Sequence, residues 1–439
     1  MQYRVFSPLA AKLLTIAGLA IVLIFPVAQV RSLVDERNSL RDTAVSSIAA
    51  DWGGRQVVAP PILAIPWEIV TRDGEYVSRR AGVVHALAAR TSVEASLVPE
   101  VRHLGIYSVP VYVASVQIAG ELDAASLAEL REEMAGRTVH WARARLILPV
   151  AAVRGIREVK AAQWGTGPVR LEPASYQDLP GVGGVVDASP LATGGRVPFR
   201  FDLRLAGSEA LQVLPLARTT TTRMTSSWPH PNFSVGEFLP ASYSLRPSGF
   251  DAHWQVLELN RNFPQSWAGD ATSAGTLLAA GYGVELHQPV DTYQRNERAI
   301  KYAVLFIAIT LMSIFLWEHL TGLRLHAVQY FMVGLALSVF YLLLLAFSEH
   351  LAFGLAYLIA AAALTALLGI YLAGALRSRR AGTLAAGTIA SVYGLLYLLV
   401  LSEQYALLLG ALLVFGVLAA IMLVTRRLDW HALGSKQDA

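Results

Sequence analysis

The sequence predicts an α+β membrane protein with six transmembrane helices and a large β-rich, sandwich-like domain inserted between helices 1 and 2. The composition predicts the membrane part, because 54% of the 439 residues are hydrophobic and only 15% are charged, whereas soluble proteins carry about 25% charged residues. The distribution predicts the inserted domain: polar and charged residues are concentrated in 31–301, and 302–425 are apolar almost throughout. Short alternating stretches inside 31–301 indicate strands.

The first predicted span is residues 13–30, LLTIAGLAIVLIFPVAQV, after a cytoplasmic N-terminus of residues 1–12 that carries Arg4 and Lys12. A basic start also suits a secretory signal peptide. The apolar core is longer than the usual signal-peptide core of about 7–15 residues, and no clear A-x-A cleavage site follows. We therefore expect an uncleaved signal anchor.

Residues 327–376 form an apolar run with a single acidic side chain, Glu349. One helix of that length would reach about 75 Å at 1.5 Å per residue, far beyond a hydrocarbon core of about 30 Å. The chain must therefore turn at the polar tripeptide Ser348-Glu349-His350. This predicts two spans, 327–347 and 351–376.

Three further apolar stretches are bounded by basic residues or by a second polar turn, Ser402-Glu403-Gln404. They predict spans at 302–320, 382–401 and 405–424, followed by a cytoplasmic tail of 425–439. In this arrangement the basic residues beside the spans gather on one side, and the two short turns contain no Lys or Arg. By the positive-inside rule both termini are cytoplasmic, and 31–301 face the outside.

Small residues recur every fourth position in two of the predicted spans. They are Ala361, Thr365, Gly369 and Ala373 in one, and Gly382, Ala386, Ala390 and Gly394 in the other. Such stripes let helix backbones approach closely in lipid. We interpret them as helix packing, rather than as the sliding interface of a transporter.

The inserted domain 31–301 shows alternating strands, a helix and glycine-rich turns. FRFDLRL at 199–205 and YVASVQI at 112–118 each place alternate apolar residues on one face. DAASLAELREEMAG at 123–136 predicts a helix with Ser126 as the start of a capping box. LPGVGG at 179–184 reads as a loop.

No catalytic, cofactor-binding or metal-binding motif is present, so we expect neither an enzyme nor a cofactor. The chain has no cysteine, which excludes disulfides and thiolate chemistry, and its net charge of +4 is spread out, without the basic stripe of a nucleic-acid-binding protein. The histidines of the inserted domain are scattered, so a metal site would have to be assembled by folding.

Two groups of residues are candidates for function. SSWPHPNFSVGEFLP at 226–240 places Trp228, His230, Phe233 and Phe238 among prolines. It is either a rigid, aromatic-packed loop or a loop that docks on a partner or on the membrane surface.

The second group is Glu349, His350 and Glu403 in the two outer turns. They are either solvated turn residues at the headgroup level or a shared proton or cation site. Glu318-His319, beside Trp317, reads instead as an interfacial anchor at the cytoplasmic side.

Several stretches resemble the CreD family of bacterial inner-membrane proteins. They are the run from PVDTYQRNERAIKYAVLF to LLLLAFSEH at 289–350, SSWPHPNFSVGEFLP with GFDAHWQ, VAPPILAIP at 58–66 and LGIYSVPVYVASVQIAGELD at 104–123. The resemblance covers nearly the whole chain; Ala327 stands where we expected proline. It implies a Gram-negative inner-membrane protein with a periplasmic domain, associated with envelope integrity and controlled by a system that responds to envelope or β-lactam stress. It implies no catalytic residues.

These observations favour a non-enzymatic envelope-integrity protein, anchored in the lipid bilayer, whose periplasmic domain meets an envelope protein or a cell-wall component. The alternative is a transporter or flippase-like protein that uses Glu349, His350 and Glu403. An enzyme acting on cell-wall material is the weakest hypothesis, because no nucleophile, metal cluster or carboxylate pair is identifiable.

Overall fold

The computed structural model describes residues 8–73, 76–130, 134–287, 292–321, 325–375, 378–402 and 405–426. The chain divides into two compact units: a helical unit, residues 1–41 with 290–439, and a β-rich unit, residues 42–289. The model is therefore α+β with a large β-rich domain between the first helix and the later helices.

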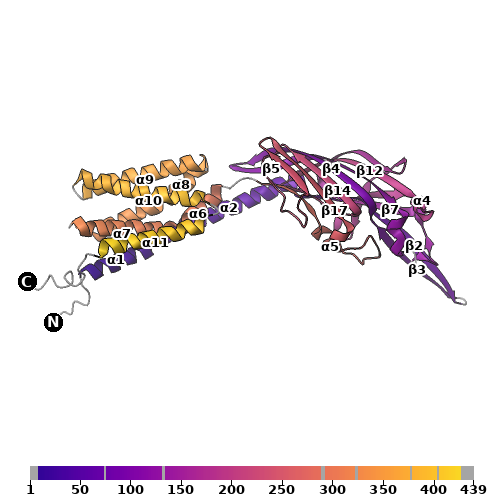
Figure 1. Ribbon diagram of the computed structural model, residues 1–439, viewed down its shortest axis with the longest axis horizontal. Coiled ribbons are helices and arrows are strands. Elements are labelled where there is room, and N and C mark those ends of the chain that lie inside the picture. Colours follow the sequence, from indigo (N-terminus) through magenta and orange to yellow (C-terminus); the bar gives the residue numbers. More distant parts are fainter. Residues whose placement is uncertain are drawn as a thin grey trace, which may run out of the picture. The chain divides into compact units, whose positions relative to one another are not determined.

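The helical unit is built from long apolar helices that lie side by side (Figure 1). The helices of the larger segment are α6 (Thr292–Lys301), α7 (Ala303–Thr321), α8 (Ala327–Ser348), α9 (Phe353–Ala375), α10 (Arg379–Leu401) and α11 (Ala406–Thr425). Among the described residues, four helices are long and apolar enough to cross a membrane, or five if α6 and α7, bent by 46°, form one span. Six spans therefore remain a prediction, with α11 in the place of the sixth.

The first helix is longer than the sequence predicts. It comprises α1 (Pro8–Val22) and α2 (Ile24–Trp52), and the amide of Leu23 still donates to the carbonyl of Leu19 at 2.9 Å, so the helix continues across the junction. Residues 31–52 are polar but contain no Pro or Gly, and charge alone does not end a helix. The strands therefore begin at Gln56, well after the predicted domain start at 31.

Helices α9 and α10 pack closely at part of the small-residue stripes, as the packing interpretation expects, and the stripes also line a groove. A Cβ added to Gly369 would lie 3.0 Å from the Cβ of Ala386, and one added to Gly382 would overlap Ala373. The two backbones thus touch where the stripes face each other, as small residues allow in lipid. Beside this contact runs a groove of about 990 Å³.

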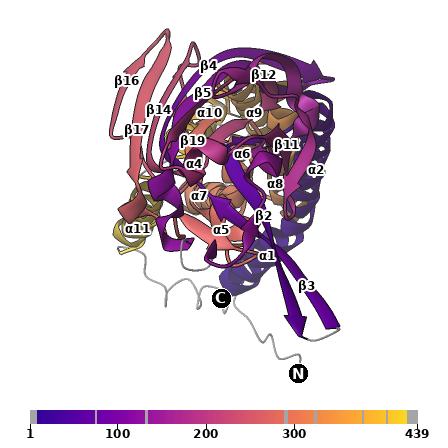
Figure 2. The same ribbon diagram turned by 90° about the vertical axis from the view of Figure 1, so that its right-hand side faces the viewer.

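The β-rich unit contains three sheets (Figure 2). The eight-stranded sheet has the order β16 (Ser242–Arg246), β17 (Gly249–Leu257), β14 (Ala217–Ser226), β4 (Ala88–Leu104), β5 (Tyr107–Asp123), β12 (Arg196–Ser208), β8 (Ile156–Trp164) and β9 (Gly167–Pro168). The seven-stranded sheet has the order β10 (Glu172–Tyr176), β11 (Leu179–Val186), β7 (Ala144–Pro149), β2 (Ile62–Asp73), β3 (Tyr76–Ala86) and β18 (Ser266–Ala268), with β6 (Thr138–Val139) beside β2. The four-stranded sheet has the order β1 (Gln56–Val58), β13 (Ala210–Val213), β19 (Tyr282–Leu286) and β15 (Pro231–Asn232).

One hydrophobic core is shared by all three sheets, as in a sandwich. Strand β12 contributes Phe199, Phe201, Leu203 and Leu205, and β5 contributes Tyr112, Ala114, Val116 and Ile118. These are the alternating residues that the sequence places on one face, so both strand predictions are confirmed. The other face of the seven-stranded sheet is covered by helix α5 (Ala274–Ala279) and the segment around Leu214.

Two local predictions in this unit are wrong. LPGVGG lies within strand β11, because its glycines let the neighbouring strand approach: a Cβ on Gly183 would collide with the carbonyl oxygen of Leu146. Within the helix predicted for 123–136, the described stretch Ala124–Leu130 is a 3₁₀ helix, η1, and residues 131–133 lie outside the described residues. Its start is capped by Asp123, whose Oδ1 accepts from the amide and the hydroxyl of Ser126, both at 2.9 Å.

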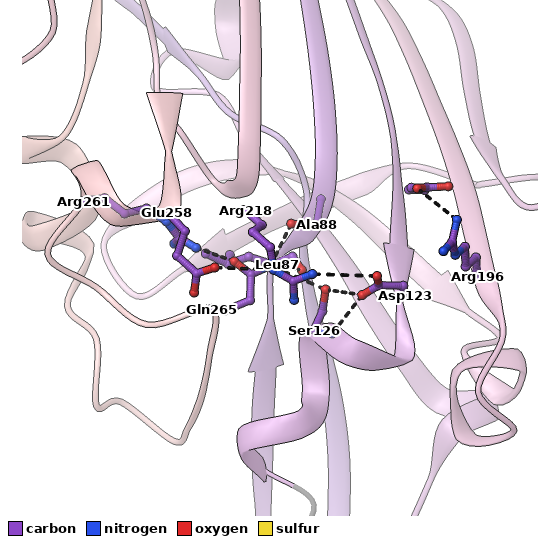
Figure 3. Close-up of polar contacts among 10 residues, drawn as sticks. Leu87, Ala88, Asp123, Ser126, Arg196, Arg218, Glu258, Arg261 and Gln265 are labelled. Carbon is purple, nitrogen blue, oxygen red and sulfur yellow. Dashed lines mark hydrogen bonds and ion pairs between the residues drawn. The ribbon is translucent and has the colours of Figure 1, made fainter. Parts of the chain in front are cut away.

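A buried polar network joins the segment before β18 to the start of β4 (Figure 3). The side-chain amide of Gln265 donates to the carbonyls of Leu87 at 2.9 Å and Ala88 at 2.7 Å. Its oxygen accepts from the guanidinium of Arg261. Burial lowers the pKa of Arg261 to about 10. Next to this network, Arg218 pairs with Glu258 at 3.4 Å.

Candidate functional site

The helical unit holds a buried charge centre where α1, α7 and α8 meet. Glu318 of α7 is 6% exposed. Its carboxylate pairs with the ammonium of Lys12, accepts from the amide of Leu325 at 3.0 Å and accepts from the hydroxyl of Tyr330 at 2.7 Å. Lys12 also donates to the carbonyl of Leu325 at 3.1 Å. The buried carboxylate thus has one counter-ion and two further hydrogen-bond donors, the contacts that offset the cost of burying a charge.

The start of α8 places Tyr330 in this centre. His326 caps the helix, its Nδ1 accepting from the amide of Val328 at 3.3 Å, and the side chain of Gln329 accepts from the amide of His326 at 2.9 Å. Ala327 is thus the first residue of the helix, the position at which proline is favoured. The replacement of the expected proline by alanine therefore leaves the cap intact.

A second charge centre lies at the far end of α8. Glu349 pairs with Arg37 of α2, with 3.2 Å between the carboxylate and the guanidinium Nε. Beside it, the side-chain amide of Asn296 donates to the hydroxyl of Ser348 at 2.8 Å. Asn296 is 1% exposed and Ser348 is 6% exposed, so this end of the helix pair α6 and α8 is joined by a buried hydrogen bond.

The two centres lie on the same pair of elements, the first helix and α8. From Lys12 to Arg37 the first helix advances about 38 Å at 1.5 Å per residue. A bilayer has a hydrocarbon core of about 30 Å and a thickness of about 40–45 Å with its headgroups. The separation of the two ion pairs along the first helix is therefore comparable with the thickness of a bilayer, and the apolar residues 13–30 lie between them.

The predicted residues of the outer turns lie only partly within the residues that the structure describes. The break between α8 and α9 covers residues 349–352, which is where the length argument places the turn. Glu349 is ion-paired and His350 is exposed. Glu403 lies outside the described residues, so its distance from Glu349 stays untested.

The candidate segment 226–240 packs against the β-rich core. The indole of Trp228 donates to the carbonyl of His287 at 3.0 Å. Phe233 contacts the rings of Phe250 and Trp254, and Phe238 contacts Tyr282.

The indole of Trp254, in strand β17, donates to the carbonyl of Phe238 in this segment at 3.2 Å. His230 of the segment is exposed. With the ring contacts, this bond favours the interpretation of 226–240 as a packed loop.

Sequence reasoning missed Glu318, Lys12, Tyr330 and Arg37 as members of charge centres. It read Glu318 as an interfacial anchor because the residue ends an apolar stretch. The available signal was that Glu318 and Glu349 each have a basic residue of the first helix at a matching depth, Lys12 and Arg37. Among the described residues, no group of three or more His, Cys, Asp or Glu side chains could hold a metal ion.

Comparisons with known proteins agree with the membrane architecture. The family model described as "Inner membrane protein CreD" matches residues 8–431. The chain is 33% identical over 434 residues to "Inner membrane protein CreD" of Escherichia coli (strain K12), covering 97% of this chain and 94% of that protein. No solved structure matches. The chain belongs to the CreD family of inner membrane proteins.

Proposed function

We propose that this protein supports the integrity of the cell envelope from the inner membrane during envelope or β-lactam stress. Its β-rich unit lies on the periplasmic side, both termini are cytoplasmic, and the β-rich unit acts by contacting a protein or cell-wall partner. The proposal includes no enzymatic reaction and no cofactor.

The observation that carries the proposal is the pairing of Glu318 and Glu349 with basic side chains of the first helix. A proton- or cation-coupled transporter needs an acidic side chain that can change its charge during the cycle. Glu318 is held by an ammonium group, a hydroxyl and a backbone amide, and Glu349 by a guanidinium. These contacts suit a fixed anchor better than the alternative transporter that uses Glu349, His350 and Glu403.

Complementation of a deletion strain tests the proposal. One version of the chain has residues 55–287 replaced by a flexible linker, and another carries Glu349→Gln with Glu403→Gln. We expect the first to lose protection against β-lactams or detergent and the second to keep it, at equal membrane levels. Full protection without the β-rich unit, or its loss in the double substitution, would favour the transporter.

The orientation is tested separately with single cysteines, since the native chain has none. A maleimide that does not cross the membrane should label a cysteine at His350 or Ser402 in intact cells. A cysteine at Ser378 should react only after the cells are opened. The reverse pattern would show that the β-rich unit faces the cytoplasm.

A further inference from the structure

Strands β2 and β3 extend beyond the rest of their sheet as a two-stranded hairpin (Figures 1 and 2). They pair with each other continuously from Leu63↔Ala86 to Asp73↔Tyr76. The other partners of β2 reach only to Glu68, and β18 pairs β3 only at Val84–Ala86. Among the described residues, 69–73 and 76–81 therefore have no second neighbouring strand. We call these residues the arm.

The base of the arm is fixed by stacked side chains. The indole of Trp67 lies over Gly82 so closely that a Cβ there would be 2.5 Å from Cζ2. The guanidinium of Arg137 lies 3.8 Å from the centre of the same indole, on its face. Below the arm, His140 and Glu68 approach to 3.4 Å. The hairpin is thus held in a defined direction where it leaves the sheet.

Apolar side chains are exposed along the arm. Val70 is 45% exposed, Val77 is 54% exposed and Tyr76 is 85% exposed. An isolated two-stranded hairpin is at best marginally stable in water. A third strand would cover part of this surface and give the hairpin the additional neighbour that it lacks.

Three arginines of the arm have no ion-pair or hydrogen-bond partner within the described part of the chain: Arg72, Arg79 and Arg80. Arginines in the neighbouring eight-stranded sheet differ, since Arg223 pairs with Asp251 at 2.6 Å and Arg200 with Asp202 at 2.9 Å. Of the side chains of the arm that the structure describes, the charged ones are therefore these three arginines.

Arginine and valine alternate on one face of the arm. Pairing places Val70 opposite Arg79 and Arg72 opposite Val77, and opposed residues of antiparallel strands share a face. Because successive side chains of a strand point to opposite faces, an added strand meets this face only with every second residue. This face therefore suits a strand in which every second residue is acidic and apolar in turn. The edges carry no proline and no β-bulge in the described pairing, two of the devices that prevent strand addition.

We propose that the arm binds an extended, acidic segment of a protein partner by strand addition, so that its free backbone groups and unpaired arginines are satisfied together. This inference rests on the proposed function, in which the β-rich unit meets a partner. It assigns the contact to the arm, 69–73 and 76–81, and not to the packed segment 226–240.

The probe is a fluorescent peptide of three Glu-Thr-Val-Thr repeats, which places Glu and Val in turn on one face of the strand, titrated with the purified full-length protein and followed by anisotropy. Arg72→Gln/Arg79→Gln/Arg80→Gln should weaken binding about thirtyfold, which is about 2 kcal/mol at 1.4 kcal/mol per tenfold. The matched control, Arg90→Gln/Arg143→Gln/Arg154→Gln, removes the same charge from exposed positions outside the arm and should change binding less than twofold. Unchanged thermal unfolding of both variants shows that they are folded.

Backbone pairing is tested with the same peptide carrying N-methylated peptide bonds, which keep the charge but remove the N–H donors. We expect its binding to be lost, and the same repeat with Lys in place of Glu not to bind. If the two triple variants weaken peptide binding equally, the binding depends on the net charge of the protein and not on the arm. Full binding of the N-methylated peptide would exclude strand addition. Binding of cell-wall sacculi or anionic vesicles through the arginines, without binding of the peptide, would overturn the choice of a protein partner.

Complementation separates this inference from the proposed function. Loss of protection in the arm triple variant, but not in the control triple variant, supports both. Full protection by the arm variant, when the chain without 55–287 gives none, overturns the arm and leaves the proposed function standing. Full protection by the arm variant and also by the chain without 55–287 overturns the proposed function.

Discussion

In the helical unit the buried carboxylate of Glu318 is held by the charge of Lys12, whereas in the β-rich unit the buried amide of Gln265 is held by two neutral backbone carbonyls. His85 of the β-rich unit is also buried and uncharged at neutral pH, because burial lowers its pKa to about 4, against the opposing effect of Asp270. The helical unit thus keeps its buried carboxylate in a pair with an opposite charge. In the β-rich unit the buried side chains of Gln265 and His85 are neutral, and the buried guanidinium of Arg261 donates to the neutral oxygen of Gln265.

Removing one charge from the buried centre should have the largest effect. In Glu318→Gln, Lys12 keeps its charge without a counter-ion, and we expect a loss of about 3 kcal/mol in the free energy of unfolding. Thermal unfolding of the protein in detergent measures this loss. The exposed Glu297→Gln should change nothing, and Lys12→Gln/Glu318→Gln should recover part of the stability. A double variant as unstable as the single one would show that the pair of charges is not what matters.

Acidification should destabilise the β-rich unit through His85. The pKa of His85 is about 4 in the folded protein and 6.5 in the unfolded chain, so the unfolded state binds the proton more readily between these values. Stability is then fully present above pH 6.5 and falls by about 3 kcal/mol as the pH drops through 4. His85→Gln should remove this part of the pH dependence, as seen in unfolding curves at pH 7 and pH 4. The substitution of the exposed His253, His253→Gln, should retain the pH dependence. Identical unfolding curves for the unchanged protein and both variants would refute the assignment of the pH dependence to His85.

The second ion pair should matter least. Arg37 is 42% exposed and Glu349 14% exposed in their side chains, and solvent-accessible pairs contribute about 0.2–1 kcal/mol. Arg37→Gln should therefore lower the unfolding temperature only slightly, and less so in high salt. Arg31→Gln on the same helix serves as the control. A loss as large as that of Glu318→Gln would mean that the two centres are equally buried.

Sequence patterns predicted the parts of this fold that depend on periodicity. Alternation identified β5 and β12, because each strand has one face in the core. Length identified the turn after Ser348, because no helix of that length fits a bilayer. The continuation of the first helix to Trp52 was missed, because the end of an apolar stretch was taken as the end of the helix. The strand character of LPGVGG was missed because close backbone approach depends on a neighbouring strand that is distant in sequence.

The candidate residues were predicted less well, since their roles depend on contacts across the fold. Glu349 was identified by its position in an apolar run, but its partner Arg37 lies 312 positions earlier in the chain. The segment around Phe233 was identified by its composition, and only the ring contacts show that its aromatic residues pack inward. The arm could not be predicted from the sequence, because a strand with one neighbouring strand shows the same alternation of residues as a strand with two.

Because Lys12 and Arg37 are separated by a fixed length of helix, the stability of this protein should depend on the acyl-chain length of the surrounding lipids. A bilayer whose hydrocarbon region matches the interval between the two ion pairs keeps both pairs in the headgroup layers. A thicker bilayer would draw at least one pair into hydrocarbon, and the helices would respond by changing their tilt, or the lipids by thinning locally, each at a modest cost per ångström. The protein should therefore be most stable in membranes of one thickness and become less stable on either side of it.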